Sequence, residues 1–371
     1  MRRSEHRGAV LTIDLDAIAA NYRFLVDRLK GKACAAVVKA NAYGLGVERV
    51  APTLAAAGAE IFCVAHLDEA IALRAILPDV EIIVLSGPIA GAEADYARHR
   101  LVPTLNHLGD LAAWRKFAAV QRGCRAALHL DTGMARLGLS AREVELIAEE
   151  PRLLEGVTVS WILSHLACAD EPDHPLNRQQ LETLRAMLAR LPCRAPVSLA
   201  NSSGIMLGAE YHFDLARAGA ALFGVNPVPR QPNPMRPVVR LQAPILQLRD
   251  VDRTTTVGYG APQTIEPPAK LATVGVGYAD GYLRSSSPRA HGVVDDVLVP
   301  IVGRVSMDLA VFDVSRAPLH AVQPGCMIDM IGPRYTIDDL ATAAGTIGYE
   351  VLTSLGSRYR RSYVGGAAAP A

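Results

Sequence analysis

Short, continuous apolar runs alternate with amphipathic helical stretches through roughly the first 220 residues, and this alternation constrains the fold more than any other feature. The apolar runs cover residues 35–39, 62–65, 82–85, 102–105, 126–130, 159–163, 197–200 and 215–223. Clear helical stretches cover residues 67–77, 108–120, 141–149 and 177–191, and another helix is expected to begin after Asp14. Strands that are apolar on both faces are typical of a parallel sheet covered by helices. About eight such units predict an α/β fold of the (β/α)8 barrel type, with a doubly wound open sheet as the alternative.

A proline-rich segment at residues 226–237 ends this pattern, because no helix or central strand accommodates five prolines so closely spaced. Beyond it, valine- and isoleucine-rich runs at 270–276, 297–302 and 327–331 are separated by Gly, Pro and Asp, and only 337–344 looks helical. We therefore predict a barrel domain over 12–232 and a mainly β domain over 238–364, with which residues 1–11 could pack. The Ala/Gly/Pro tail, 365–371, is predicted to be disordered.

The composition excludes several classes of function. The 371 residues carry a net charge of +1, which provides no broad field for nucleic acid or an acidic membrane. No apolar run is long enough to span a bilayer, and Asp14 and Asp16 interrupt the apolar stretch that a signal peptide needs after a basic start. The six cysteines are scattered, without a C-x-x-C pair or histidines at metal-ligand spacing. We therefore expect a cytoplasmic protein with reduced thiols and no metal.

Lys39 ends the first apolar run, directly after Val37 and Val38. In a barrel, the carboxyl ends of the strands form the active-site face. A lysine desolvated there could have a lowered pKa and react with an aldehyde. Taken alone, however, a lysine at a strand end is more often structural, with its stem on apolar surface and its ammonium group in water.

The stretch around Lys39, VVKANAYGLG at residues 37–46, resembles the cofactor-lysine signature of the alanine racemases. Further matching stretches follow in the family's order, from about Leu11 to Val364. They are LDTGMARLG at 130–138, SHLA at 164–167, ANS at 200–202, RAG at 217–219, GYG at 258–260, GYADG at 277–281 and GRVSMD at 303–308. The resemblance implies a (β/α)8 barrel with a C-terminal β domain, and pyridoxal 5′-phosphate as the cofactor. It also implies interconversion of L- and D-alanine, either to supply D-alanine for peptidoglycan of the cell wall or for alanine catabolism.

By this resemblance, two bases act on opposite faces of a planar intermediate. Lys39 would bind the cofactor covalently and serve the face of D-alanine, and Tyr259 would serve the face of L-alanine. A tyrosine with a pKa of about 10 is a poor base unless its phenolate is stabilised, which a neighbouring arginine network does in the family. In family dimers this tyrosine enters the active site of the other subunit, so a homodimer is implied.

The other implied site residues bind the cofactor or the substrate. Arg217 would face the pyridine nitrogen and keep it unprotonated, with His165 as the partner that orients Arg217. The remaining cofactor-binding positions are Tyr43, Asn201, Ser202 and the backbone amides of Gly219 and Ala220. Arg136 and the Met307 amide would bind the substrate carboxylate, and Tyr278, Arg284, Arg304 and Asp308 would lie at the entrance to the site.

The chain departs from the family pattern at two places. Many members carry a carbamylated lysine that steadies the arginine equivalent to Arg136, and this chain has His129 there. A chloride ion or a side-chain carboxylate could replace the carbamate. Many members also place a tyrosine beside the phosphate, where this chain has Ser357, followed closely by Tyr359. Either residue could contact the phosphate, and the extra room predicts some side activity on serine.

Three other classes of protein share part of this pattern. Decarboxylases of basic amino acids share the architecture and the cofactor, but they place an acidic residue where this chain has Arg217. A non-enzymatic protein that binds pyridoxal phosphate usually consists of the barrel alone, which leaves the β domain without a purpose. A periplasmic racemase of broad specificity is disfavoured because no signal peptide is recognised.

Overall fold

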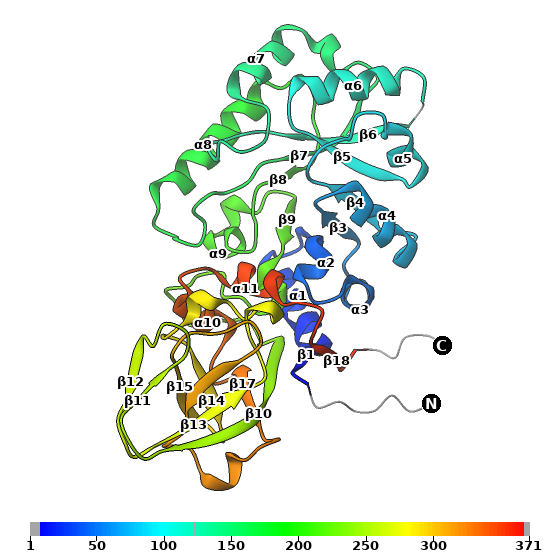
Figure 1. Cartoon of the computed structure of the whole chain (residues 1–371). Coiled ribbons are helices and arrows are strands. Elements are labelled where there is room, and N and C mark those ends of the chain that lie inside the picture. The colour runs from blue at the N-terminus through cyan, green and yellow to red at the C-terminus, as the bar shows by residue number, and fades with distance from the viewer. Residues whose placement is uncertain (1–7, 122, 367–371) are drawn as a thin grey trace, which may run out of the picture.

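The computed structural model describes residues 8–121 and 123–366, which form a barrel and a β domain packed against it (Figure 1). The barrel contains eight parallel strands in the order β8-β7-β6-β5-β4-β3-β2-β9. Their bounds are β2 Ala33–Val37, β3 Ile61–Val64, β4 Glu81–Val84, β5 Leu101–Leu105, β6 Arg125–His129, β7 Thr158–Leu163, β8 Val197–Ser198 and β9 Leu215–Ala218.

The two ends of this sheet meet. The backbone N–H of Arg217 donates to the carbonyl of Ala200 at 2.9 Å, and a parallel bridge joins Asn201 to Arg217. The predicted (β/α)8 barrel is therefore confirmed, and the open doubly wound sheet is excluded. Two strands are shorter than predicted: β8 ends at Ser198, and β9 ends at Ala218, where a 3₁₀ segment, Ala220–Phe223, follows it.

Helices cover the outside of the barrel (Figure 1). The first begins after Asp14 as predicted, and the Asp14 carboxylate accepts the N–H of Ala17 at 2.8 Å. The helix bounds are α1 Leu15–Arg28, α3 Val47–Ala56, α4 Leu67–Ile76, α5 Glu93–Arg98, α6 Leu108–Ala118, α7 Ala141–Glu149, α8 Pro175–Arg190 and α9 Gly204–Leu207. The sequence pattern missed α3, which contains Pro52, and the short helices α5 and α9, which have six and four residues. No helix in the described ranges is long and apolar enough to cross a membrane.

The β domain is built on a second eight-stranded sheet, in the order β13-β16-β15-β14-β17-β10-β1-β18. Its strands are β1 Val10–Asp14, β10 Val239–Val251, β13 Ala269–Val274, β14 His291–Val294, β15 Val297–Val302, β16 Ala310–Asp313, β17 Met327–Ile331 and β18 Arg360–Val364. A separate hairpin pairs β11 Thr255–Val257 with β12 Gln263–Ile265. Strand β1 is antiparallel to β10 and parallel to β18. Residues 12–14, predicted within the barrel domain, thus pair with the β domain.

Two helices of the β domain lie at its junction with the barrel (Figure 1). They are α10 Ile337–Ala344 and α11 Gly348–Ser354, of which only α10 was predicted. The tail predicted to be disordered, 365–371, is described only as far as Gly366, whose N–H donates to the Asp16 carboxylate at 2.9 Å. Residues 367–371 lie outside the described part. Residues 1–7 lie outside it as well.

Candidate active site

A cavity of about 620 Å³ lies at the carboxyl ends of the barrel strands, where α11 approaches the barrel. This volume is typical of a cofactor or substrate site. Every cofactor-binding residue predicted from the sequence lines it, together with Arg136 and His129. These residues are Lys39, Tyr43, His129, Arg136, His165, Asn201, Ser202, Arg217, Gly219 and Ala220.

Lys39 begins a short, strained turn, α2, Lys39–Tyr43. Ala40, Asn41, Ala42 and Tyr43 all have left-handed φ angles, between 52° and 55°. Each such non-glycine residue costs about 1–2 kcal/mol, so contacts outside the turn must hold it. The Glu69 carboxylate accepts the N–H of Ala40 at 2.6 Å. As a result, the turn presents both Lys39 and Tyr43 to the cavity.

The environment of Lys39 favours its neutral amine. Burial, followed by the positive charge of Arg136, lowers the pKa of Lys39, and Arg217 acts in the same direction. Glu69 opposes the shift. A neutral lysine amine is the form that attacks an aldehyde and that accepts a proton.

Arg217 is buried in the cavity wall and held by four acceptors. Its guanidinium donates to the carbonyl and hydroxyl of Ser198 at 3.0 and 2.5 Å, and to the carbonyl of Ser164 at 2.5 Å. It also lies 3.2 Å from Nδ1 of His165. Arginine can only donate, so His165 Nδ1 is the acceptor. Burial and Arg217 together lower the pKa of His165 well below its ordinary value, so the imidazole is neutral.

Ser202, Gly219 and Tyr43 form a polar cradle on the same wall. The Ser202 hydroxyl oxygen accepts the N–H groups of Gly219 and Ala221 at 2.9 and 3.3 Å, which leaves its own proton free to donate. A Cβ added to Gly219 would lie 2.5 Å from the Tyr43 hydroxyl, so only glycine allows this approach. Burial raises the pKa of Tyr43, which keeps its hydroxyl a neutral donor. Converging donors without an acidic side chain suit a phosphate group.

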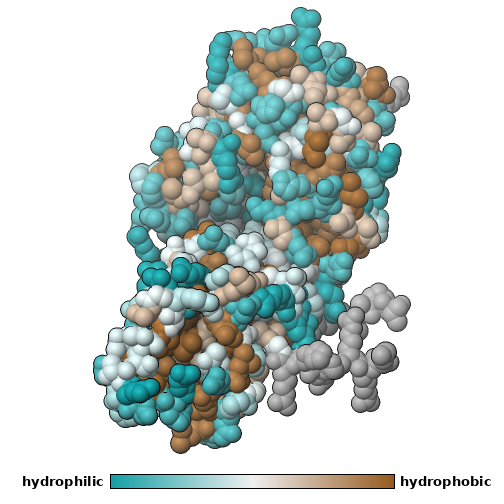
Figure 2. Space-filling model, viewed as in Figure 1, coloured by the Kyte–Doolittle hydropathy of each residue, from teal (hydrophilic) through white to brown (hydrophobic). Residues whose placement is uncertain are grey.

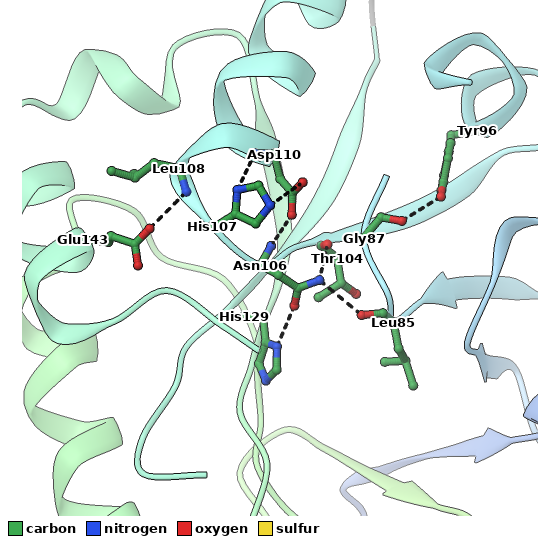
Figure 3. A network of polar contacts seen from close by, with 10 residues as sticks. All are labelled: Leu85, Gly87, Tyr96, Thr104, Asn106, His107, Leu108, Asp110, His129 and Glu143. Atoms are coloured by element: carbon green, nitrogen blue, oxygen red, sulfur yellow. Dashed lines mark hydrogen bonds and ion pairs between the residues drawn. The ribbon is translucent and has the colours of Figure 1, made fainter. Parts of the chain in front are cut away.

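His129 lies at the end of β6, with its Nδ1 2.8 Å from Oδ1 of Asn106 (Figure 3). Burial and the charge of Arg217 lower its pKa to about 4. Of the two predicted ways to steady Arg136, the structure does not support a side-chain carboxylate, because Arg136 forms no ion pair within residues 8–121 and 123–366. The chloride ion stays a prediction.

The wall contributed by α11 corrects one prediction. Tyr349, Glu350 and Thr353 line the cavity, whereas neither Ser357 nor Tyr359 does in the described chain. The prediction that one of these two residues contacts the phosphate is therefore not supported. The Tyr349 ring lies 6.2 Å from that of Tyr43, centroid to centroid, so a tyrosine occupies this wall from another position. Sequence reasoning missed Tyr349 because nothing in its local pattern links it to a strand more than 300 residues earlier.

The remaining predicted residues form a second group, on the β domain. The backbone N–H of Tyr278 donates to the Ser306 carbonyl at 3.0 Å, and the backbone of Gly258, next to Tyr259, packs against Arg304. Asp308 pairs with Arg358 at 2.8 Å, and Arg284 begins a short 3₁₀ turn. None of the six residues lines the cavity of its own chain as described here: Tyr259, Tyr278, Arg284, Arg304, Met307 and Asp308.

Comparison with known proteins identifies both domains. Residues 13–227 match the model of the alanine racemase N-terminal domain, and residues 238–363 match that of the C-terminal domain. The chain is 51% identical to an alanine racemase of Rhodospirillum rubrum over 98% of each chain. It is 49% identical to a catabolic alanine racemase of Mesorhizobium japonicum, covering 97% of this chain and 94% of the relative.

Solved structures agree with these matches. The crystal structure of alanine racemase from Bartonella henselae with covalently bound pyridoxal phosphate superimposes with a TM-score of 0.92. The two sequences are 39% identical, and the match covers 96% of this chain and 99% of the other. Fold, site geometry and relatives lead to one conclusion: the chain belongs to the alanine racemase family.

Proposed function

We propose that the chain is a pyridoxal-phosphate-dependent isomerase that interconverts L- and D-alanine. The observation that carries this proposal is the grouping of a lysine of lowered pKa, a donor-only arginine and a polar cradle around one cavity. The chemistry is that of the family to which the chain belongs.

The residues present fit the cofactor. Lys39 would hold it covalently, Arg217 would face the pyridine nitrogen, and Ser202, Tyr43 and the nearby backbone amides would hold the phosphate. When bound, the cofactor supplies the electron withdrawal that acidifies the α-carbon of the substrate. Asn201 lines the cavity beside Ser202 and is the last predicted position of this group.

The protein residues then move the α-proton and hold the carboxylate. Lys39, whose pKa is lowered by burial in the cavity, would accept or return the proton on the D-alanine face. Tyr259 would do so on the L-alanine face. Arg136 would bind the carboxylate with the Met307 amide, and Tyr278, Arg284, Arg304 and Asp308 would flank the entrance.

This assignment requires a homodimer. Tyr259 is 75% exposed and Met307 54% exposed, and both belong to the β domain, away from the cavity of their own chain. Hydrophobic residues also reach the surface of the β domain on the face in view (Figure 2). A twofold dimer would bring the β-domain group of one subunit to the cavity of the other.

We also place the enzyme in the cytoplasm. All six cysteines are free thiols in the structure. Reduced thiols are typical of a reducing compartment. Secretion with formation of a native disulfide would contradict this placement.

The direct test is to purify the protein with pyridoxal phosphate, supply L-alanine and follow D-alanine by chiral chromatography. Formation of D-alanine that is lost in both Lys39→Ala and Tyr259→Phe supports the racemase and its two bases. Bound cofactor without racemisation would contradict it. The predicted side activity on serine rested on extra room at the wall that Tyr349 occupies, and it is tested in parallel. Turnover of L-serine comparable to that of L-alanine supports it, and no detectable turnover contradicts it.

A further inference from the structure

His129 has one ring nitrogen bound within the protein and a ring that lines the cavity. Nδ1 lies 2.8 Å from the side-chain oxygen of Asn106, which follows β5 (Figure 3). One of these two atoms must carry the shared hydrogen. The orientation of the Asn106 amide decides which atom it is.

The contacts of Asn106 leave only one orientation for that amide. Its NH₂ group donates to the backbone carbonyls of Thr104 at 3.2 Å and Leu85 at 3.4 Å. The reversed amide would place its oxygen against both carbonyl oxygens. Asn106 is only 3% exposed, and its backbone N–H donates to the Asp110 carboxylate at 2.9 Å. Burial and this backbone contact hold the side chain in place. The amide oxygen therefore faces His129, and His129 Nδ1 must donate.

This tautomer leaves Nε2 of His129 with a lone pair and no hydrogen. The His129 ring is kept neutral mainly by burial, which lowers its pKa. The charges of Arg217 and Arg136 lower this pKa further, and Asp131 raises it. Asp131 uses Oδ1 to accept the N–H groups of Gly133 and Met134, so it shapes the loop that carries Arg136.

Arg136 is the complementary group. It lines the same cavity and lies close enough to influence His129, Lys39 and His165 electrostatically. In the described ranges its guanidinium has neither a hydrogen-bond partner nor an ion-pair partner. Arg217, by contrast, already donates to Ser198 and Ser164.

We propose that Nε2 of His129 accepts a hydrogen bond from the Arg136 guanidinium and positions it for the substrate carboxylate, while Asn106 holds the ring in the required tautomer. The proposal rests on the carboxylate-binding role given to Arg136 under the proposed function. In this arrangement Arg136 needs no chloride ion, because Nε2 of His129 supplies the acceptor directly. His129 and Asn106 are thus positioning residues that act through Arg136.

The first experiment separates positioning from general structural support. In His129→Leu, the KM for L-alanine and the inhibition constant of propionate should rise together by about tenfold to a hundredfold, as loss of a hydrogen bond to a charged group predicts. The kcat should change by less than about threefold, because Arg136 holds the carboxylate equally in the ground and transition states. His129→Gln, whose amide oxygen can accept from Arg136, should restore most of the affinity.

His107→Asn is the matched control, because His107 adjoins Asn106 and caps α6 but is not among the residues that line the cavity in the described chain. Asparagine keeps the capping acceptor, so both constants should stay unchanged. A fall in kcat alone in His129→Leu, or equal effects in the Leu and Gln variants, would overturn the proposal. So would a wild-type KM that rises when gluconate replaces chloride in the buffer.

The second experiment reads the tautomer without turnover. In holoenzyme labelled with ¹⁵N-histidine, the His129 resonances, assigned by their loss in His129→Gln, should show the hydrogen on Nδ1. Asn106→Leu should allow hydrogen on Nε2 and raise the propionate inhibition constant. Hydrogen on Nε2 in the wild type would contradict the proposal. A wild type that binds propionate but fails to racemise alanine would contradict only the proposed function.

Discussion

At the residue scale, the contact between Gly219 and Tyr43 depends on the missing side chain of Gly219. The Tyr43 hydroxyl occupies the place where a Cβ of residue 219 would lie. Tyr43 packs against Phe223, with ring centroids 4.9 Å apart, so it has little freedom to retreat. The geometry of the proposed phosphate cradle therefore depends on both residues.

Gly219→Ala should weaken pyridoxal phosphate binding about tenfold, because the added methyl group displaces Tyr43 at a cost of about 1–3 kcal/mol. Titration of the apoenzyme with the cofactor measures the Kd. The double variant Gly219→Ala with Tyr43→Phe should bind the cofactor no more weakly than the two single effects added together. The reason is that phenylalanine lacks the hydroxyl with which the new methyl group would clash. Gly8→Ala, which has no neighbour within 4 Å, is the control. Unchanged binding in Gly219→Ala would contradict the cradle.

His129 also makes stability depend on pH. Its pKa is about 4 in the fold and 6.5 ordinarily, so between these values the unfolded chain binds a proton that the folded chain excludes. Stability is therefore lost as the pH falls through this window, by about 2 kcal/mol between pH 7 and about pH 5. Urea midpoints of wild type and His129→Gln at the two pH values measure this difference. The protonation of His165 lowers the stability of both proteins equally. An equal loss of stability in the wild type and in His129→Gln would therefore refute the assignment to His129.

At the scale of elements, the left-handed turn α2 carries strain at its alanine and tyrosine residues. Its contacts come from another part of the barrel: Glu69 of α4 accepts N–H groups from Ala40, Ala65 and His66. The Asn41 side chain accepts the N–H of Val47, which ties the turn to the start of α3. The turn therefore keeps its hand through tertiary contacts.

Ala40→Gly should stabilise the protein by about 0.5–1 kcal/mol, because relief of a left-handed alanine exceeds the extra entropy cost of glycine. Ala40 is exposed, so no packing is lost. Ala55→Gly, in the right-handed helix α3, is the contrasting variant. It should destabilise by at least about 1 kcal/mol, because Ala55 also packs against the core. Urea denaturation measures both changes. A loss of stability in Ala40→Gly equal to that in Ala55→Gly would show that the turn is unstrained.

The same elements show how far the sequence predicts the structure. The eight barrel strands are recognisable because each is a continuous apolar run, and Lys39 is recognisable by its motif. The left-handed conformation of α2 is not recognisable from the sequence, because its residues locally favour a right-handed turn. The contact that holds the left-handed form comes from Glu69, on another helix. Strand β1 was missed because its partners, β10 and β18, lie more than 220 residues away. Helix α11 was missed because seven residues show too little periodicity.

At the scale of the whole molecule, the cavity belongs to both domains. The barrel supplies Lys39, His165 and Arg217, and the β domain supplies Tyr349 and Glu350 through α11. The barrel residues were predicted from motifs at strand ends, whereas the α11 wall depends on how the domains pack. The proposed second base, Tyr259, lies on the β domain but outside this wall, so under the proposed function it would act on the cavity of a partner subunit.

The most direct test of the central claim, that Lys39 of one subunit and Tyr259 of another act on one substrate, is to mix two inactive variants. Lys39→Ala and Tyr259→Phe should each be nearly inactive alone. After co-expression, random dimers should recover about a quarter of the wild-type activity, because half are mixed and each mixed dimer has one intact site. Mixed dimers that form, as native mass spectrometry can verify, yet stay inactive would contradict the claim.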